Sequence, residues 1–142
     1  MEKTHAYVLA LGRLLLSGLF IWAGYGKLKA PGAAMQYFVK VGVPLPSLVV
    51  WVAILIEFVG GIALLVGFKT RWVAALLAIW CVISGFAVHL VAGVSSSDAT
   101  IAYDNMLHFY KNLAMAGGLL FVFVQGAGQV SIDDRFRVAR AR

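Results

Sequence analysis

The stretch SLVVWVAILIEFVGGIALLVGF, residues 47–68, decides the fold class of this chain. Its 22 residues contain a single charge, Glu57. At about 1.5 Å of rise per residue, a helix of this length crosses the roughly 30 Å hydrocarbon core of a bilayer. The sequence therefore predicts an all-α, polytopic membrane protein with one domain, residues 1–142, and four transmembrane helices in a bundle. The other three predicted spans are residues 7–28, 72–93 and 104–125.

The composition agrees with a membrane protein and excludes several other classes. Hydrophobic residues make up 62% of the 142 positions and charged residues 13%, and the mean hydropathy is +0.90. Soluble domains carry about a quarter charged residues. A disordered chain, a nucleic-acid-binding domain and a disulfide-stapled secreted module are excluded. Cys81 is the only cysteine, so the chain has no internal disulfide.

The first connection, residues 31–46, predicts a short helix that lies in the membrane interface. Met35, Phe38 and Val39 are spaced for one apolar face, and two prolines end the helix before the second span.

The basic residues predict the orientation of the chain in the membrane. The net charge of +6 comes from lysines and arginines near the ends of the spans and from a basic tail, residues 131–142. Four spans place both termini on one side, which carries seven basic residues against three on the other side. The positive-inside rule therefore predicts that both termini, and the tail, are cytoplasmic.

Ionisable residues inside the spans are the candidate functional residues, because a charge at the bilayer centre costs at least about 2.5–3.5 kcal/mol. Arg13, Glu57 and Lys111 lie on helix faces that also carry small residues, and such faces turn toward the bundle interior. Their depths predict a buried Arg13–Glu57–Lys111 network. Asn112 lies on the same face of its helix as Lys111. An outer vestibule above the network is expected to be lined by Lys27, His89, Asp104 and His108.

Three interpretations of this network stay open. In the first, two cations neutralise one carboxylate and hold the helices in register. In the second, the network is the floor of an outward-facing pocket, whose surplus positive charge binds the head group of a quinone or a lipid. In the third, Glu57 conducts protons.

His89 and His108 lie on adjacent predicted spans, near the outer surface of the membrane. A haem bound by two histidines, or a metal ion, is therefore conceivable there. Neither His89 nor His108 belongs to an HxxxH or HxxE motif, and interfacial histidines more often bond to water or to loop carbonyls. No metal site is therefore predicted, and haem is disfavoured. The sequence also lacks a nucleophile–base pair, a phosphate-binding glycine loop and paired catalytic carboxylates, so it identifies no reaction.

Several short motifs together resemble the DoxX family of small bacterial membrane proteins. They are GRLLL at 12–16, GYGKL at 24–28, EFVGG at 57–61, KNL at 111–113 and GGLL at 117–120. The resemblance implies a four-helix, multi-pass protein of the bacterial inner (plasma) membrane, related to the membrane subunit of a thiosulfate:quinone oxidoreductase. The polar positions that match the family pattern are Arg13, Lys27, Glu57, His89 and Asn112.

The leading hypothesis is a redox-associated accessory subunit that binds a quinone-like or lipid head group in an outward-facing polar pocket. A quinone is the candidate cofactor. The expected partners are the lipid bilayer, a redox protein and further copies of the chain, but not nucleic acid. As an enzyme, the chain is at most a subunit of a membrane oxidoreductase complex. One alternative is a structural or chaperone-like scaffold without ligand chemistry, and another is a transporter of a small solute or of protons.

Overall fold

The computed structural model describes residues 2–140, and every regular element within them is helical. Four stretches are long and apolar enough to cross a membrane, which confirms the predicted fold class. The second and third of these spans each contain a π-helical turn, labelled η, between two α-helical pieces. The elements are α1 (Glu2–Lys29), α2 (Pro31–Lys40), α3 (Pro46–Ile54), η1 (Leu55–Val59), α4 (Gly60–Val66), α5 (Thr70–Ser84), η2 (Gly85–Leu90), α6 (Val91–Ser95), α7 (Ala99–Gln125) and α8 (Ile132–Arg140).

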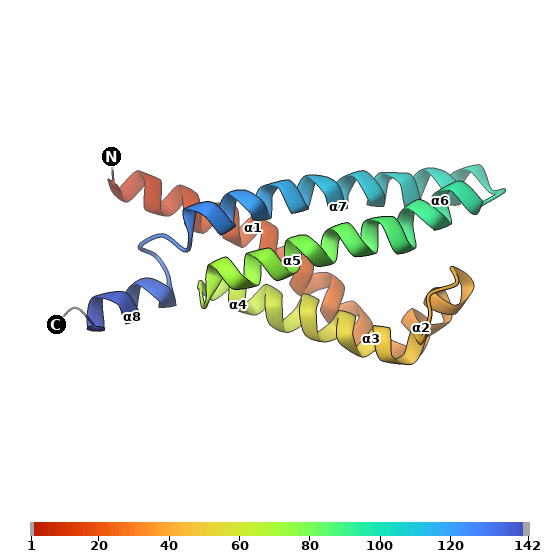
Figure 1. Ribbon diagram of the computed structural model, residues 1–142, viewed down its shortest axis with the longest axis horizontal. Coiled ribbons are helices and arrows are strands. Elements are labelled where there is room, and N and C mark those ends of the chain that lie inside the picture. Colours follow the sequence, from red (N-terminus) through yellow and green to blue (C-terminus); the bar gives the residue numbers. More distant parts are fainter. Residues whose placement is uncertain (1, 141–142) are drawn as a thin grey trace.

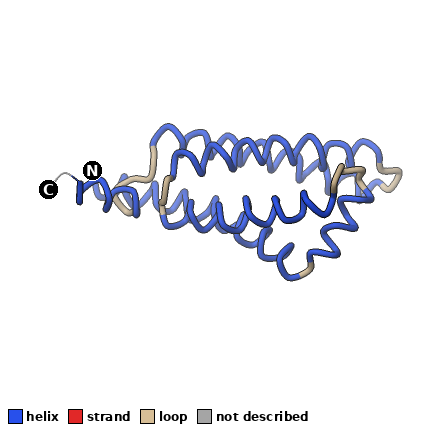
Figure 2. The backbone as a smooth tube through the Cα atoms, turned by 60° about the horizontal axis from the view of Figure 1, so that its bottom comes forward, coloured by secondary structure: helices blue, strands red, loops and turns tan. Residues whose placement is uncertain are grey.

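Two pairs of helices make up the bundle. α1 packs along η1 and α4, and α5 packs along α7. Both termini lie at one end of the bundle, while α2 and the turn between α6 and α7 lie at the other end (Figure 1). Figure 2 shows the long helices following one common axis, with loops gathered at its two ends. We call these the terminal end and the α2 end.

The centre of the bundle is a cluster of buried apolar side chains contributed by all four spans. Small residues bring the helices close enough to form it, because helices in lipid associate by close packing. At Gly61, an added Cβ would lie only 2.9 Å from Ile21 Cγ1, so α1 and α4 touch there. The central side chains include Phe20, Leu64, Leu77 and Leu119.

Large apolar side chains cover the outside of the spans. Leu15, Trp22, Trp72 and Phe121 are 69–77% exposed. Such a surface would drive aggregation in water, whereas in a bilayer it matches the surrounding hydrocarbon. The exposed apolar surface therefore agrees with a protein that sits in lipid.

The predicted short helix after the first span is present as α2, and one residue of its predicted apolar face packs against the bundle. Phe38 alone of the three residues is buried, packed against Val50 and Ile54 of α3 and Val88 of η2. Val39 is 61% exposed. The reason is that α2 docks onto the bundle through one large side chain, which fills a gap between two spans.

The last span begins earlier than the sequence predicts. α7 starts at Ala99 because the Asp98 carboxylate caps it, accepting hydrogen bonds from the backbone N–H groups of Thr100 (2.8 Å) and Ile101 (3.1 Å).

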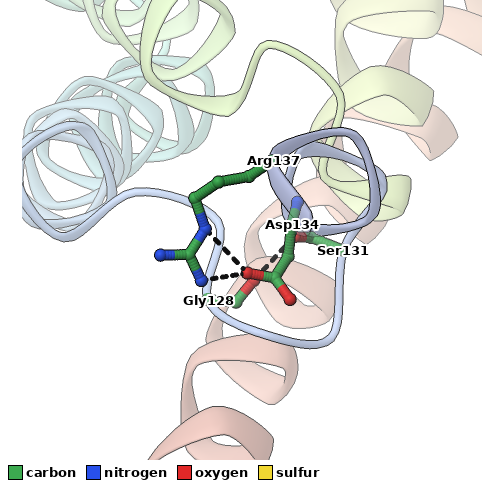
Figure 3. A network of polar contacts seen from close by, with 4 residues as sticks. All are labelled: Gly128, Ser131, Asp134 and Arg137. Atoms are coloured by element: carbon green, nitrogen blue, oxygen red, sulfur yellow. Dashed lines mark hydrogen bonds and ion pairs between the residues drawn. The ribbon is translucent and has the colours of Figure 1, made fainter. Parts of the chain in front are cut away.

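The basic tail contains a helix, α8, that the sequence analysis did not predict. Ser131 caps it: the hydroxyl accepts from the Asp134 backbone N–H (3.1 Å) and donates to the Gly128 carbonyl (2.6 Å). Asp134 pairs in turn with Arg137, one turn further along (Figure 3). A serine cap followed three residues later by an acid is a known helix start, so the sequence SIDD at 131–134 carried the signal.

Candidate ligand-binding site

A cavity of about 920 Å³ lies between α1, α2, η2 and α7, in the half of the bundle toward the α2 end. Its volume and its largely apolar walls are typical of a small-molecule site. The wall includes Leu19, Ala23, Val88 and Met115. Six of the seven candidate site residues also line it: Lys27, Glu57, His89, His108, Lys111 and Asn112.

Glu57 is held by two donors that flank it. Lys27 Nζ donates to one carboxylate oxygen at 2.6 Å, and Trp80 Nε1 donates to the other at 3.0 Å. The close approach of α1 to η1 makes the first contact short, since an added Cβ at Gly24 would lie 2.5 Å from the Phe58 nitrogen. Gly24 is one helical turn before Lys27, so the glycine lets the lysine reach across.

The two π-helical turns carry two of these polar side chains. Glu57 lies in η1 and His89 in η2. A π turn inserts one extra residue into a helix and therefore changes the direction of the side chains that follow, and such turns are frequent at functional sites. No simple α-helical wheel could place these residues relative to one another.

The histidines lie side by side at the α2 end of the cavity. Their ring centres are 5.1 Å apart. Lys111 Nζ lies 2.8 Å from His108 Nδ1, and His89 Nδ1 lies 3.2 Å from Asn105 Oδ1. Among residues 2–140, no group of three or more histidine, cysteine, aspartate or glutamate side chains could hold a metal ion.

The charged side chains that line the cavity are mostly positive. Three lysines and one glutamate face it, so it carries two more positive than negative charges when the histidines are neutral. Glu57 is already paired with Lys27. Lys111 makes its described hydrogen bond to a histidine and not to a carboxylate. The cavity therefore offers unneutralised positive charge to a ligand.

The predicted Arg13–Glu57–Lys111 network is wrong in both of its links. Glu57 is bonded to Lys27 and Trp80, and Lys111 to His108. Asp104, expected in the vestibule, is not among the residues that line the cavity. Arg13 does not reach Glu57 because it lies about 21 Å along α1 from Lys27, the cation that does bind this carboxylate.

Arg13 lies outside the cavity, toward the terminal end. It is 3% exposed, and it donates to the carbonyls of Ala127 (2.7 Å) and Val130 (2.5 Å) in the loop before α8. Lys27 is fourteen residues further along α1, which is about 21 Å in a helix. The C-terminal loop folds back over the bundle and its carbonyls bind Arg13, a long-range contact that no pattern in the sequence indicates.

Three residues of the site were not predicted. Trp80 is not among the predicted candidates, although its indole binds Glu57. Tyr37 on α2 donates to Asn105 on α7, at 3.0 Å, and so ties α2 to the bundle. For Asn105 the sequence did carry a signal. An asparagine inside a predicted span is costly in lipid and is therefore expected to have a polar partner.

Comparison with known proteins gives matches over nearly the whole chain. The DoxX family model matches residues 8–90. The inner membrane protein YqjF of Escherichia coli is 36% identical, over 94% of this chain and 95% of its own length. The inner membrane protein YphA of the same organism is 27% identical, over 90% and 89%. An uncharacterized protein of Haemophilus influenzae is 34% identical over 96% of each chain. No solved structure matches the chain.

Proposed function

The chain belongs to the DoxX family of integral membrane proteins, and on that footing we propose that its cavity binds the oxygen-rich head group of a quinone-class molecule. The observation that carries the proposal is the convergence of six polar side chains from all four spans on one cavity with apolar walls. Each of these groups is costly in a membrane, and a polar ligand head recovers part of that cost.

The chemistry of the cavity fits such a head group. A quinone offers carbonyl oxygens, which accept hydrogen bonds, and a flat apolar ring. Lys111 is a donor with no described carboxylate partner, and the histidines add two more polar positions. Apolar residues such as Leu19 and Met115 suit the ring and the start of its tail. A bound quinone would supply a two-electron carrier, whereas the chain's own part is to bind and orient it.

The same proposal makes the protein an accessory subunit. Nothing in the sequence identifies a reaction, so a bound quinone would exchange its electrons with a separate redox protein. Further copies of this chain are a second class of partner. In such a complex, this chain would provide the quinone-binding cavity within the membrane. The partner would be sought by crosslinking in intact membranes.

We further propose that both termini are cytoplasmic, which places the cavity in the outer half of the membrane. The termini lie at the same end of the bundle (Figure 1). Alkaline phosphatase fused after the C-terminus should be inactive, and phosphatase inserted at Ser96, between α6 and α7, should be active. The reverse pattern would contradict the orientation. Apart from Arg13 and Lys111 inside the spans, the basic residues of the described chain at the terminal end are Lys3, Lys69, Arg71, Arg135, Arg137 and Arg140, and those near the α2 end are Lys27, Lys29 and Lys40.

The binding proposal is tested by mass spectrometry of solvent extracts from gently purified protein. We expect a quinone in near-stoichiometric amount. Lys111→Met should reduce it several-fold, because the substitution removes the unneutralised positive charge but keeps the side-chain length. The matched control is Lys40→Met, which removes an equal charge from α2 outside the cavity.

The other outcomes are equally informative. An extract that contains only bulk phospholipid would contradict the proposal and favour the scaffold hypothesis. A haem band in the reduced-minus-oxidised spectrum would replace the quinone with a haem between His89 and His108. Equal quinone content in the two lysine variants would remove Lys111 from the site.

A further inference from the structure

A hydrogen-bond chain links α2 to the histidines through a buried asparagine. Asn105 is 8% exposed, and its Nδ2 donates to the Ile101 carbonyl at 3.0 Å. A carbonyl only accepts, so this bond fixes which way the Asn105 amide points. The amide oxygen therefore faces both Tyr37 and His89, at 3.0 Å and 3.2 Å. Burial raises the pKa of the Tyr37 phenol, so the tyrosine keeps its proton and donates it.

The fixed amide determines the tautomer of His89. Because Asn105 Oδ1 only accepts, His89 Nδ1 must carry a hydrogen. A neutral imidazole carries one hydrogen, so His89 Nε2 is left with a lone pair. Within residues 2–140, the fully buried nitrogen and oxygen atoms without a hydrogen-bond partner are Arg13 Nε and Thr70 Oγ1. His89 Nε2 is not one of them, and the His89 side chain lines the cavity.

The second histidine has the opposite tautomer. The ammonium group of Lys111 has only donors, so His108 Nδ1 accepts from it. An imidazolium has no lone pair and could not accept this bond, so His108 is neutral and carries its hydrogen on Nε2. One histidine thus presents an acceptor and its neighbour presents a donor, on rings whose centres are 5.1 Å apart.

From this pairing we propose that His89 and His108 recognise a ligand hydroxyl and so select the reduced, hydroxyl-bearing form of the quinone-class head group over the carbonyl form. A hydroxyl donates to His89 Nε2 and accepts from His108 Nε2–H. Two such bonds of about 2.8 Å join nitrogens up to about 5.6 Å apart, and rings whose centres are 5.1 Å apart can hold their nitrogens within that reach. A carbonyl oxygen satisfies His108 only and faces the His89 lone pair.

This inference rests on the proposed quinone site and adds a role for Asn105 and Tyr37, which hold the histidine from behind. Asn105 is a positioning residue, since it sets the tautomer of His89. Tyr37 brings α2 into the same hydrogen-bond chain, so that the helix covering the cavity is anchored beside the histidine. Losing one hydrogen bond to a buried acceptor predicts a preference of about tenfold.

The tautomers can be measured without any ligand. The chain has three histidines, so ¹⁵N-histidine NMR of the full-length protein in nanodiscs gives few signals. At pH 8, where an ordinary histidine is neutral, we expect His89 as the Nδ1–H tautomer and His108 as the Nε2–H tautomer. The variants His89→Phe and His108→Phe assign the signals. A His89 signal from the Nε2–H tautomer would overturn the inference.

The selectivity is measured by equilibrium binding of a short-tailed ubiquinone and of the same compound chemically reduced under argon. We expect the wild type to bind the reduced form about tenfold more tightly. Asn105→Leu should bring that ratio close to one, because His89 is then free to change tautomer. Tyr37→Phe keeps the Asn105–His89 bond, so the ratio should stay near the wild-type value even if the overall affinity falls.

The outcomes separate the two proposals. Equal binding of both forms by the wild type would overturn the hydroxyl selectivity and leave the quinone site standing. A ratio that survives in a folded Asn105→Leu protein would also overturn it. Binding of neither form would overturn the proposed function itself, and with it this inference.

Discussion

At the terminal end of the bundle a buried arginine is enclosed by the chain's own backbone, whereas at the α2 end a lysine faces a cavity. Arg13 is 3% exposed and donates to two carbonyls of the loop before α8, Ala127 and Val130. Lys111 is partly exposed and donates to His108, a neutral side chain. Both cations lie within predicted spans, and both carry the cost of charge in a membrane.

The difference teaches that a charge inside a span does not by itself indicate a ligand site. Arg13 donates to carbonyls of the C-terminal loop and does not line the cavity, so its described contacts hold that loop on the bundle. The scaffold hypothesis therefore describes the terminal end well. Lys111 keeps hydrogen-bonding capacity that the described chain does not use, and the ligand hypothesis belongs to the α2 end. Three predictions test this division.

The largest expected effect is that of Arg13→Met. The substitution leaves the carbonyls of Ala127 and Val130 without their donor, at about 1–3 kcal/mol each, so we expect a loss of about 2–6 kcal/mol. Thermal unfolding in detergent measures it. The control is Arg137→Met on the exposed face of α8, whose surface ion pair is worth at most about 1 kcal/mol. Equal unfolding temperatures for the two variants would contradict a stabilising role for the Arg13 contacts at the terminal end.

Gly67→Ala tests how tightly the terminal end is packed. Gly67 has a φ of +70°, and an added Cβ would lie 2.2 Å from Arg13 Nη1 and 2.5 Å from Ser131 Cβ. Gly42, beside α2, has a φ of +75° with no described atom within 4 Å of such a Cβ. The left-handed backbone costs both alanine variants about 1–2 kcal/mol.

The two variants therefore differ by packing alone. Overpacking should add about 1–3 kcal/mol to the cost of Gly67→Ala. Thermal unfolding of the two variants side by side gives the difference. If Gly42→Ala is as destabilising as Gly67→Ala, the terminal end is no tighter than the α2 end.

The smallest expected effect compares two helix caps. Asp133 accepts from the backbone N–H groups of Lys69 (2.7 Å) and Thr70 (2.8 Å) and so caps α5 from the far end of the sequence. Asp98 caps α7 locally. Replacing either aspartate by alanine should cost about 1 kcal/mol.

Limited trypsin digestion then separates the two caps. Asp133→Ala should release α8 and speed cleavage after Arg135, because the cap also ties the tail to the α4–α5 turn. Asp98→Ala should leave that cleavage rate unchanged. Unchanged cleavage in Asp133→Ala would show that the Asp133 side chain does not hold the C-terminal loop, which Arg13 and the bond from Asp133 N–H to the Gly67 carbonyl would then hold.

Much of the fold could be predicted because membrane insertion depends on the hydrophobicity summed over each stretch of the chain. Glu57 in an otherwise apolar stretch was sufficient to identify a span with one interior polar group. The predicted candidates Lys27, His89, His108 and Asn112 were chosen because polar groups in a span must face inward, and all of them line the cavity. The capped start of α7 at Asp98 and the cap of α8 at Ser131 were also visible as local patterns, although both were missed.

The partners of these residues could not be predicted in the same way. Glu57 takes Lys27 and not Arg13 because Gly24 lets α1 approach η1 closely, and because a loop from the far end of the chain occupies Arg13. Trp80 and Asn105 join the site across helix interfaces. None of these contacts has a counterpart in spacing along the sequence.

The sequence by itself determined that the chain spans a membrane four times and which polar residues must avoid lipid, because the cost of transfer into hydrocarbon adds up residue by residue. Only the tertiary structure decided which of these groups neutralise one another and which remain available around the cavity. That choice depends on distances between helices, on π turns that redirect side chains and on a returning loop, and these are set by packing between segments far apart in the chain.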